Sequence, residues 1–404
     1  MKKEIYKKFL AIIASFVRIL NSLALTKFAA FYFSERVFTS FNQVQNFSNI
    51  LQSGLNSISG TALTKHYDED IKKEVISSTF TAIWLVQLII TVIGFVILGI
   101  NKNVLLYNYG ILKYSILLVP IFSAPFVVFS NLEYIKQRLE RFVCYNLLYL
   151  IICIPIAFYS FRVYGAEGII YFLLIANLTT SIIVYIINRS NGINLRHTRR
   201  SIVHKILRTT YVSIIVSFLG IGSLILTRYL LNQSTDQKTI IEWDVIIKLT
   251  FTYNFIINAI IQYQILPELR MYYSNNKTLF HKKMRSSVLS IILIWGGACT
   301  VIYFMSDFLV ILFFNESFSG NKKFLLFQMI NDFIRILGMF LSNVIILTAF
   351  VYKKLIITEI IVNIFLISMV FLLINSLKVY GYYIADFLKC ILYIILIKRL
   401  YNAI

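Results

Sequence analysis

Long apolar stretches alternate with short polar segments along the whole chain of 404 residues. An apolar run of about 20 residues is long enough to cross the roughly 30 Å hydrocarbon core of a bilayer as a helix. The pattern therefore predicts an all-α polytopic membrane protein with about twelve transmembrane helices. These lie near residues 9–33, 41–64, 76–100, 111–135, 142–160, 166–188, 207–230, 243–267, 286–306, 324–350, 355–375 and 380–398.

The basic residues lie mainly on one side of these predicted spans. The side that holds both termini carries 25 of the 39 Lys and Arg residues, and the opposite side carries nine. Segments rich in Lys and Arg stay in the cytoplasm. Both termini are therefore predicted to be cytoplasmic in a multi-pass protein.

A polar connection at the middle of the chain, Asn188 to Arg208, is the longest on the cytoplasmic side. It predicts two six-helix lobes, residues 1–195 and 196–404. Three dipeptides recur between these halves at offsets of 208, 212 and 216 residues: Asn46-Phe47 with Asn254-Phe255, Ser130-Asn131 with Ser342-Asn343, and Tyr164-Gly165 with Tyr380-Gly381. Duplicated transporters of this kind bind substrate between their repeats.

Composition narrows the class further. With 58% hydrophobic and 14% charged residues, the chain is too apolar for a soluble protein. The formal charge of +21 comes from basic segments between spans, so nucleic acid is not expected as a partner. The four cysteines fall inside predicted spans without metal-ligand spacing, and no nucleotide-binding motif occurs. No metal, cofactor or catalytic residue is predicted.

The second predicted span carries amides at alternating spacings of three and four residues, which places them on one helical face. Amide groups facing lipid are costly, so this face is expected to line protein or a water-filled cavity. The chain is rich in Asn throughout, so a purely compositional origin is the alternative. The five candidates are Asn42, Gln45, Asn49, Gln52 and Asn56.

Charged side chains within spans are rare, and each is a candidate functional group. Asp332 and Arg335 are three residues apart, as are Asp386 and Lys389, so each pair can meet on one helix face and neutralise itself structurally. The basic candidates for substrate binding are Arg18, Lys27, Lys248, Arg335 and Lys389. Lys27 and Lys248 can instead extend to the membrane interface. Basic groups would attract a diphosphate and amides would bind sugar hydroxyls, which favours an anionic glycoconjugate as ligand.

On these residues the chain resembles Wzx-type flippases for O-antigen and lipid III, in the polysaccharide-transporter family of the MATE-like MOP superfamily. The resemblance runs nearly end to end. It is carried by Arg18 and Lys27, Asn42 to Phe47, Thr64 to Tyr67, Leu266 to Arg270, Phe327-Gln328 with Asp332 and Arg335, and Thr358 to Ile360.

The resemblance implies a two-lobed, twelve-helix protein of the bacterial inner membrane. Such a protein would flip an undecaprenyl-diphosphate-linked oligosaccharide to the periplasmic leaflet by alternating access, without being an enzyme. It would work beside a polymerase and a chain-length regulator of the same pathway. Asp332, Asp386 and Glu359 are then the candidates for ion or proton coupling.

Two other functions fit a chain of this length and hydropathy. A polysaccharide polymerase would need a sizeable periplasmic loop, whereas the predicted outer loops are short. A MATE-like small-molecule exporter shares the fold but carries cationic drugs, and would place acidic rather than basic groups at its centre.

Overall fold

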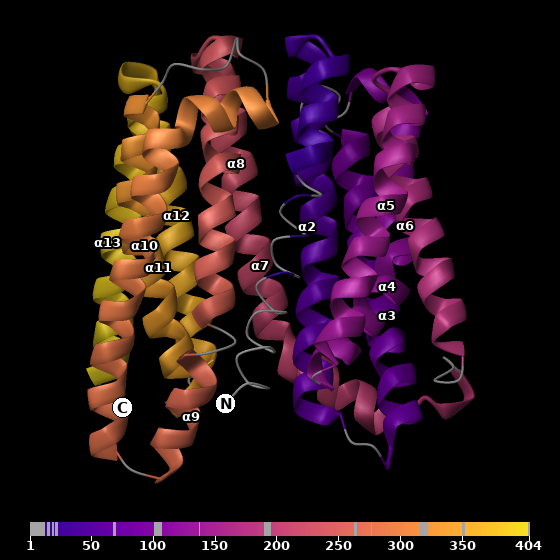
Figure 1. The fold of residues 1–404 in the computed structure, drawn as a ribbon, viewed down its shortest axis with the longest axis vertical. Helices are drawn as coiled ribbons and strands as arrows, with labels where there is room; N and C mark the ends of the chain where they lie inside the picture. The colour runs from indigo at the N-terminus through magenta and orange to yellow at the C-terminus, as the bar shows by residue number, and fades with distance from the viewer. Residues whose placement is uncertain are drawn as a thin grey trace. The chain divides into compact units, whose positions relative to one another are not determined.

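The computed structural model describes residues 13, 17, 20, 23–67, 70–100, 107–136, 138–189, 195–261, 265–275, 277–314, 322–349 and 352–402. These residues form helices and short connections, and none of them lies in a β-strand (Figure 1). The all-α fold class predicted from the apolar pattern is confirmed.

The chain divides into two compact units. The N-terminal unit is Phe28–Gly222, and the C-terminal unit is Ser223–Ile404 with Met1–Lys27. The boundary at Gly222 falls inside a long helix, whereas the predicted lobes 1–195 and 196–404 meet in the polar segment before it.

The N-terminal unit contains the apolar helix Leu23–Tyr32 from Phe28 onward, five complete α-helices, two 3₁₀ helices and the first part of a sixth α-helix. Its buried core joins Leu55, Phe80, Phe129 and Tyr145. The elements of this unit are α2 (Glu35–His66), α3 (Lys72–Ile100), the 3₁₀ helix η1 (Tyr107–Leu118), α4 (Val119–Ile135), α5 (Leu139–Tyr164), α6 (Gly168–Ile187), η3 (Leu195–His197) and the first part of α7 (Arg200–Ser234).

The C-terminal unit contains the rest of α7 and six further helices. Its core is built on Trp243, Tyr253, Phe340 and Tyr383. Its helices are α8 (Gln237–Ile260), α9 (Leu266–Asn275), α10 (Lys277–Phe313), α11 (Lys322–Ala349), α12 (Tyr352–Leu377) and α13 (Val379–Asn402). The short helix α9 was not expected from the apolar pattern.

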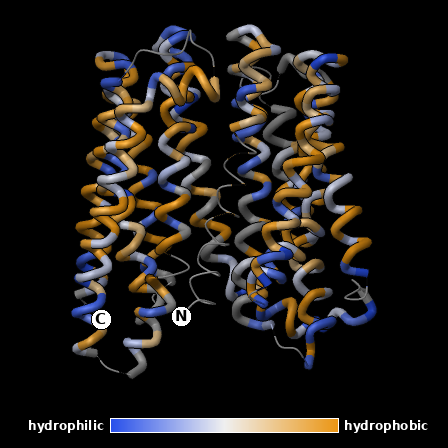
Figure 2. Tube along the Cα trace, viewed as in Figure 1, coloured by the Kyte–Doolittle hydropathy of each residue, from blue (hydrophilic) through white to orange (hydrophobic). Residues whose placement is uncertain are grey.

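Nine helices of the described chain are long and apolar enough to cross a membrane. Figure 2 shows apolar residues along much of these helices. The exposed side chains of α10 include Leu293, Phe304 and Phe308, which suits a surface that faces lipid. Helices α2 and α8 cover two more of the twelve predicted spans, but they carry too many polar residues to qualify by hydropathy. The predicted span 9–33 is described at residues 13, 17 and 20 and from residue 23 onward, where the apolar helix Leu23–Tyr32 lies.

Two helical hairpins, α5–α6 and α12–α13, share one turn geometry. Gly165 and Lys378 both have a left-handed backbone, with φ of 54° and 51°. Each accepts a backbone hydrogen bond, from Gly168 at 3.1 Å and from Gly381 at 3.0 Å respectively. Gly165 and Lys378 are 213 residues apart, and so are Gly168 and Gly381, which supports a duplicated architecture. The alignment of Gly165 with Gly381 at offset 216 is therefore wrong by three residues.

Candidate functional site

The Asp332 carboxylate, on α11, is the centre of a buried polar network in the C-terminal unit. Its side chain is fully buried, and it accepts hydrogen bonds from four side chains. Tyr253 and Asn254 of α8 donate at 2.7 and 2.8 Å, and Gln328 and Arg335 of α11 donate at 2.9 and 2.6 Å. Both oxygens of the carboxylate are thus satisfied, as burial of a charge requires.

Arg335 joins this carboxylate to a second one on α13. Its guanidinium donates to Asp332 through Nη1 and to Asp386 through Nη2. Asn331 also donates to Asp386, at 3.1 Å, and to the Tyr383 carbonyl, at 2.9 Å. The side chain of Arg335 is 41% exposed, whereas those of Asp332 and Asp386 are 0% and 3% exposed. The accessible side chain of the ion group is therefore that of Arg335.

Asp332 and Arg335 form the ion pair that their spacing predicted. Asp386 and Lys389 do not form the second predicted pair, because Arg335 binds Asp386 across the interface of α11 and α13. The Lys389 ammonium donates instead to Asn363 of α12, at 3.2 Å. Helical spacing identifies which residues share a face, but it cannot reveal a closer partner on another helix.

Asn363 connects Lys389 to α7. Its side-chain oxygen accepts from Ser223 at 2.8 Å as well as from Lys389. Its amide nitrogen donates to the backbone carbonyl of Glu359 at 2.8 Å, and lies 3.5 Å from that residue's carboxylate. Glu359 is therefore part of the same polar chain, one helical turn from Asn363.

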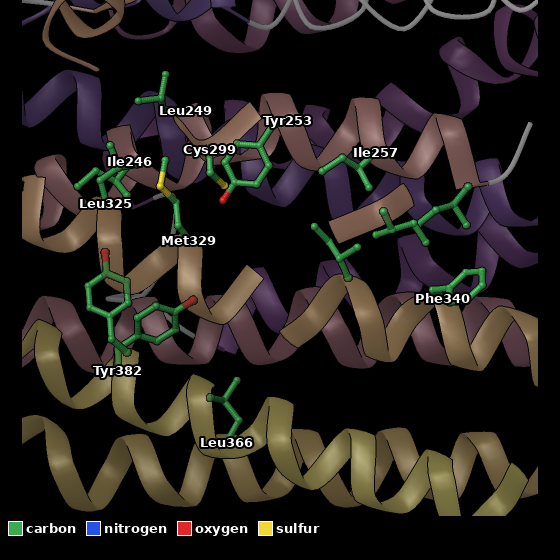
Figure 3. Close-up of a cluster of buried hydrophobic side chains, with 14 of the residues drawn as sticks. Ile246, Leu249, Tyr253, Ile257, Cys299, Leu325, Met329, Phe340, Leu366 and Tyr382 are labelled. Carbon is green, nitrogen blue, oxygen red and sulfur yellow. The ribbon is translucent and has the colours of Figure 1, made fainter. Parts of the chain in front are cut away.

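Apolar residues surround the network. Figure 3 shows Met329 and Cys299 beside Tyr253, and Leu325 next to Ile246 in the same buried cluster. Around the two covered carboxylates water competes little for the hydrogen bonds, so charge interactions there are stronger than at a surface. Cys299 is a free thiol, as are the other three cysteines, and only Cys144 is exposed.

Two of the predicted basic ligands hold the start of the chain against the C-terminal unit. Lys27 donates to the carbonyls of Ile311 and Phe314, both at 2.7 Å, at the end of α10. These are carbonyls that a helix leaves without intrahelical partners. Lys248 donates to Thr26 at 3.3 Å. Both ammonium groups thus make contacts that can serve the fold.

The predicted amide face of α2 has a graded exposure. Asn42 is buried, Gln45 and Gln52 are half-buried, and Asn49 is exposed. Gln52 donates to Ser48 at 3.2 Å. On the reverse face Val44, Phe47 and Leu51 are all buried. Arg18 and the side chain of Asn56 lie outside the described residues.

Several residues of the network carried no signal in the sequence. Tyr253 and Asn331 are ordinary residues of apolar spans, and only the recurring Asn254-Phe255 dipeptide pointed to Asn254. A second buried ion pair, Arg228 with Asp244, joins α7 to α8. These two residues are 16 apart in the chain, so no helical periodicity relates them.

The comparisons with known proteins support the fold. No protein-family model and no curated protein matches the chain in sequence. In structure it is similar to a MOP superfamily transporter from Pyrococcus furiosus, described as having a binding pocket of reverse polarity that suggests a different function. The identity is 14%, the match covers 98% of this chain and 94% of that one, and the TM-score is 0.73.

Two conformations of a multidrug resistance MATE family transporter are also similar. The outward-facing one gives a TM-score of 0.70 and the inward-facing one 0.66, each at 14% identity over 98% of this chain. The matches cover 95% of the inward-facing chain and 94% of the outward-facing one. The protein thus has the fold of MATE transporters.

Proposed function

We propose that the protein is a flippase that moves an undecaprenyl-diphosphate-linked oligosaccharide across the bacterial inner membrane. The cargo would be an O-antigen or enterobacterial common antigen repeat unit, carried from the cytoplasmic to the periplasmic leaflet by alternating access. One observation carries the proposal: the accessible side chain of the buried network belongs to a cation, Arg335, while both of its carboxylate partners are covered. A guanidinium suits a diphosphate, because it can bind phosphate oxygens through two parallel hydrogen bonds.

The amide groups on α2 suit the sugar part of such a cargo. Amides donate and accept hydrogen bonds, as sugar hydroxyls do. Gln45, Asn49 and Gln52 are accessible at least in part on one helix face. In this proposal they contact the glycan, while the cationic groups contact the diphosphate.

Ion coupling would involve the carboxylates of the C-terminal unit. Asp332 and Asp386 share one guanidinium, and Glu359 lies beside the Asn363–Lys389 contact. Binding of an anionic head to Arg335 would weaken its hold on both aspartates and favour proton or cation uptake there. A polymerase and a chain-length regulator would use the flipped product.

A MATE-like small-molecule exporter is the second candidate, favoured by the multidrug resistance transporters with this fold. A cationic drug needs an accessible acidic group, and Asp332 and Asp386 are both covered. The Pyrococcus furiosus neighbour, with its pocket of reverse polarity, is a precedent for a different function on this fold.

Reconstitution into liposomes separates the two candidates. Vesicles holding the purified protein and undecaprenyl-diphosphate N-acetylglucosamine are treated with an impermeant enzyme that modifies the exposed sugar. The flippase proposal predicts that the protected inner-leaflet fraction becomes accessible with protein and stays protected without it. The same vesicles should not move ethidium. Ethidium transport without glycolipid movement would overturn the proposal.

A further inference from the structure

An apolar groove of about 490 Å³ lies between α7 and α12 in the C-terminal unit. Its volume falls within the roughly 300–1,000 Å³ of small-molecule sites. Leu226, Tyr229 and Leu230 line one side, and Ile367, Phe371 and Leu372 line the other. The one hydroxyl on the α12 side, Ser368, already donates to the Ile364 carbonyl. The groove thus offers a surface for hydrocarbon.

The groove begins next to the polar network. Ser223 and Asn363, which hydrogen-bond to each other at 2.8 Å, precede the groove residues on their helices by about one turn. The two helices therefore run in the same direction along the groove. Asn363 also accepts a hydrogen bond from the Lys389 ammonium. The groove therefore starts about 6 Å along the helix axis from a polar contact that includes a cation.

A ligand that matches both parts is an amphiphile with an anionic head and a long hydrocarbon tail. The tail of such a molecule cannot enter water, because each CH₂ group exposed costs about 0.8 kcal/mol. It must therefore stay in hydrocarbon while the head crosses the membrane. The groove extends about 6–8 Å along two membrane-crossing helices and provides an apolar surface for part of such a tail.

We propose that this groove holds the head-proximal part of the polyprenyl tail of the lipid-linked substrate, with its diphosphate toward Lys389 and Arg335. The assignment rests on the proposed function and adds the place of the tail. With the predicted cytoplasmic termini, α7 and α12 both run outward. The groove then lies on the periplasmic side of the Ser223–Asn363 contact, where the tail of the flipped product would be.

Site-directed photocrosslinking tests this occupant. Phe371 in the groove is replaced by p-benzoylphenylalanine in the full-length protein, and Phe304 on α10 is the matched control. Both are exposed phenylalanines, at 63% and 77%, and Phe304 is outside the groove. The nanodiscs contain phosphatidylethanolamine, phosphatidylglycerol and radiolabelled undecaprenyl diphosphate.

Labelling at position 371 should exceed that at 304 by about tenfold, and unlabelled undecaprenyl diphosphate should compete it away. Equal labelling at both positions would overturn the proposal. Crosslinks at position 371 mainly to phosphatidylethanolamine would overturn it too, because the groove would then hold ordinary membrane lipid.

A second pair of variants tests the groove during transport. Ser368→Trp fills it, and Ser290→Trp on α10 is the control, because both hydroxyls are exposed and donate to the carbonyl four residues earlier. The first should slow glycolipid flipping by about tenfold and the second should leave it unchanged. Equal rates in the two variants would contradict the assignment. Selective crosslinking at 371 in a wild-type protein that does not flip would overturn the proposed function alone.

Discussion

The Arg335 guanidinium is shared by two buried carboxylates, so the stability of each charge depends on the other two. Removing one member of a buried ion group leaves a charge without compensation and costs about 3–5 kcal/mol. Asp332 has three other donors, whereas in the described part of the chain Asp386 accepts only from Asn331 in addition to Arg335. Changes at Arg335 should therefore affect Asp386 most.

Combined variants should show this dependence. Arg335→Gln alone is expected to lower the free energy of unfolding by about 3 kcal/mol, because it leaves two buried carboxylates. The double variant Arg335→Gln with Asp332→Asn should recover only part of this lost stability, since Asp386 keeps its charge. The triple variant with Asp386→Asn should recover most of the yield and melting temperature. Additive losses across the series would show that the three residues do not act as one group.

The Asp236 carboxylate caps the start of α8, in the short connection after α7. It accepts from the backbone N–H of Thr239 at 3.0 Å and from the hydroxyl of the same residue at 2.9 Å. These hydrogen bonds, the backbone one first, hold the pKa of Asp236 below its ordinary value of 3.8. A carboxyl with a lowered folded-state pKa stabilises the protein above its unfolded pKa and loses that effect as pH falls.

Asp236→Ala should therefore lower the free energy of unfolding by about 1 kcal/mol at neutral pH, and the loss should shrink as pH falls below about 4 and through the lowered pKa of the folded state. Asp236→Asn keeps the cap without the titration and serves as control. Thermal unfolding in detergent, at neutral pH and in acid, measures the difference in stability between each variant and the wild type. A loss of equal size in acid would rule out the carboxylate as its source.

At the scale of the helical elements, the hairpins α5–α6 and α12–α13 each depend on a close backbone approach. A Cβ atom at Gly381 would lie 2.8 Å from the Leu373 carbonyl oxygen, and one at Gly168 would meet the Ser160 carbonyl oxygen. At Gly296, in the middle of α10, a Cβ atom would meet nothing within 4 Å. The first two glycines are therefore needed for packing, and the third is not.

Alanine at Gly168 or Gly381 should lower the free energy of unfolding by about 1–3 kcal/mol, and the melting temperature with it, because the hairpin must open to admit the methyl group. Gly296→Ala should be neutral or slightly stabilising, since alanine favours a helix. Thermal unfolding of the three purified variants is the measurement. Similar losses in all three would mean that the glycines act through helix propensity alone.

The helices themselves were largely predictable, because membrane-crossing segments must be apolar for about 20 residues and this is visible in sequence. The Asp332–Arg335 pair was also predictable, because residues three apart on a helix lie on one face. The capture of Asp386 by Arg335, and the donors Tyr253 and Asn363, depend on how separate helices pack. Nothing in the periodicity of one helix encodes that packing.

At the scale of the whole molecule, α2 should present two different faces. Its reverse face is packed in the N-terminal unit, whereas the amide face is accessible at Asn49. In a background without native cysteines, Asn49→Cys and Gln45→Cys should react with a water-soluble thiol reagent. Val44→Cys and Leu51→Cys should be protected. Equal labelling of both faces would remove α2 as a cavity wall.

Binding of the anionic head by the Arg335 group is the central claim, and the affinity of the purified protein for undecaprenyl diphosphate tests it most directly. The wild type should bind this ligand, and the triple variant Asp332→Asn, Arg335→Gln and Asp386→Asn should fold but bind it about tenfold or more weakly. Tetraphenylphosphonium, a cation, should bind neither protein well. Equal affinity of both proteins for undecaprenyl diphosphate, or tighter binding of the cation by the wild type, would contradict the account.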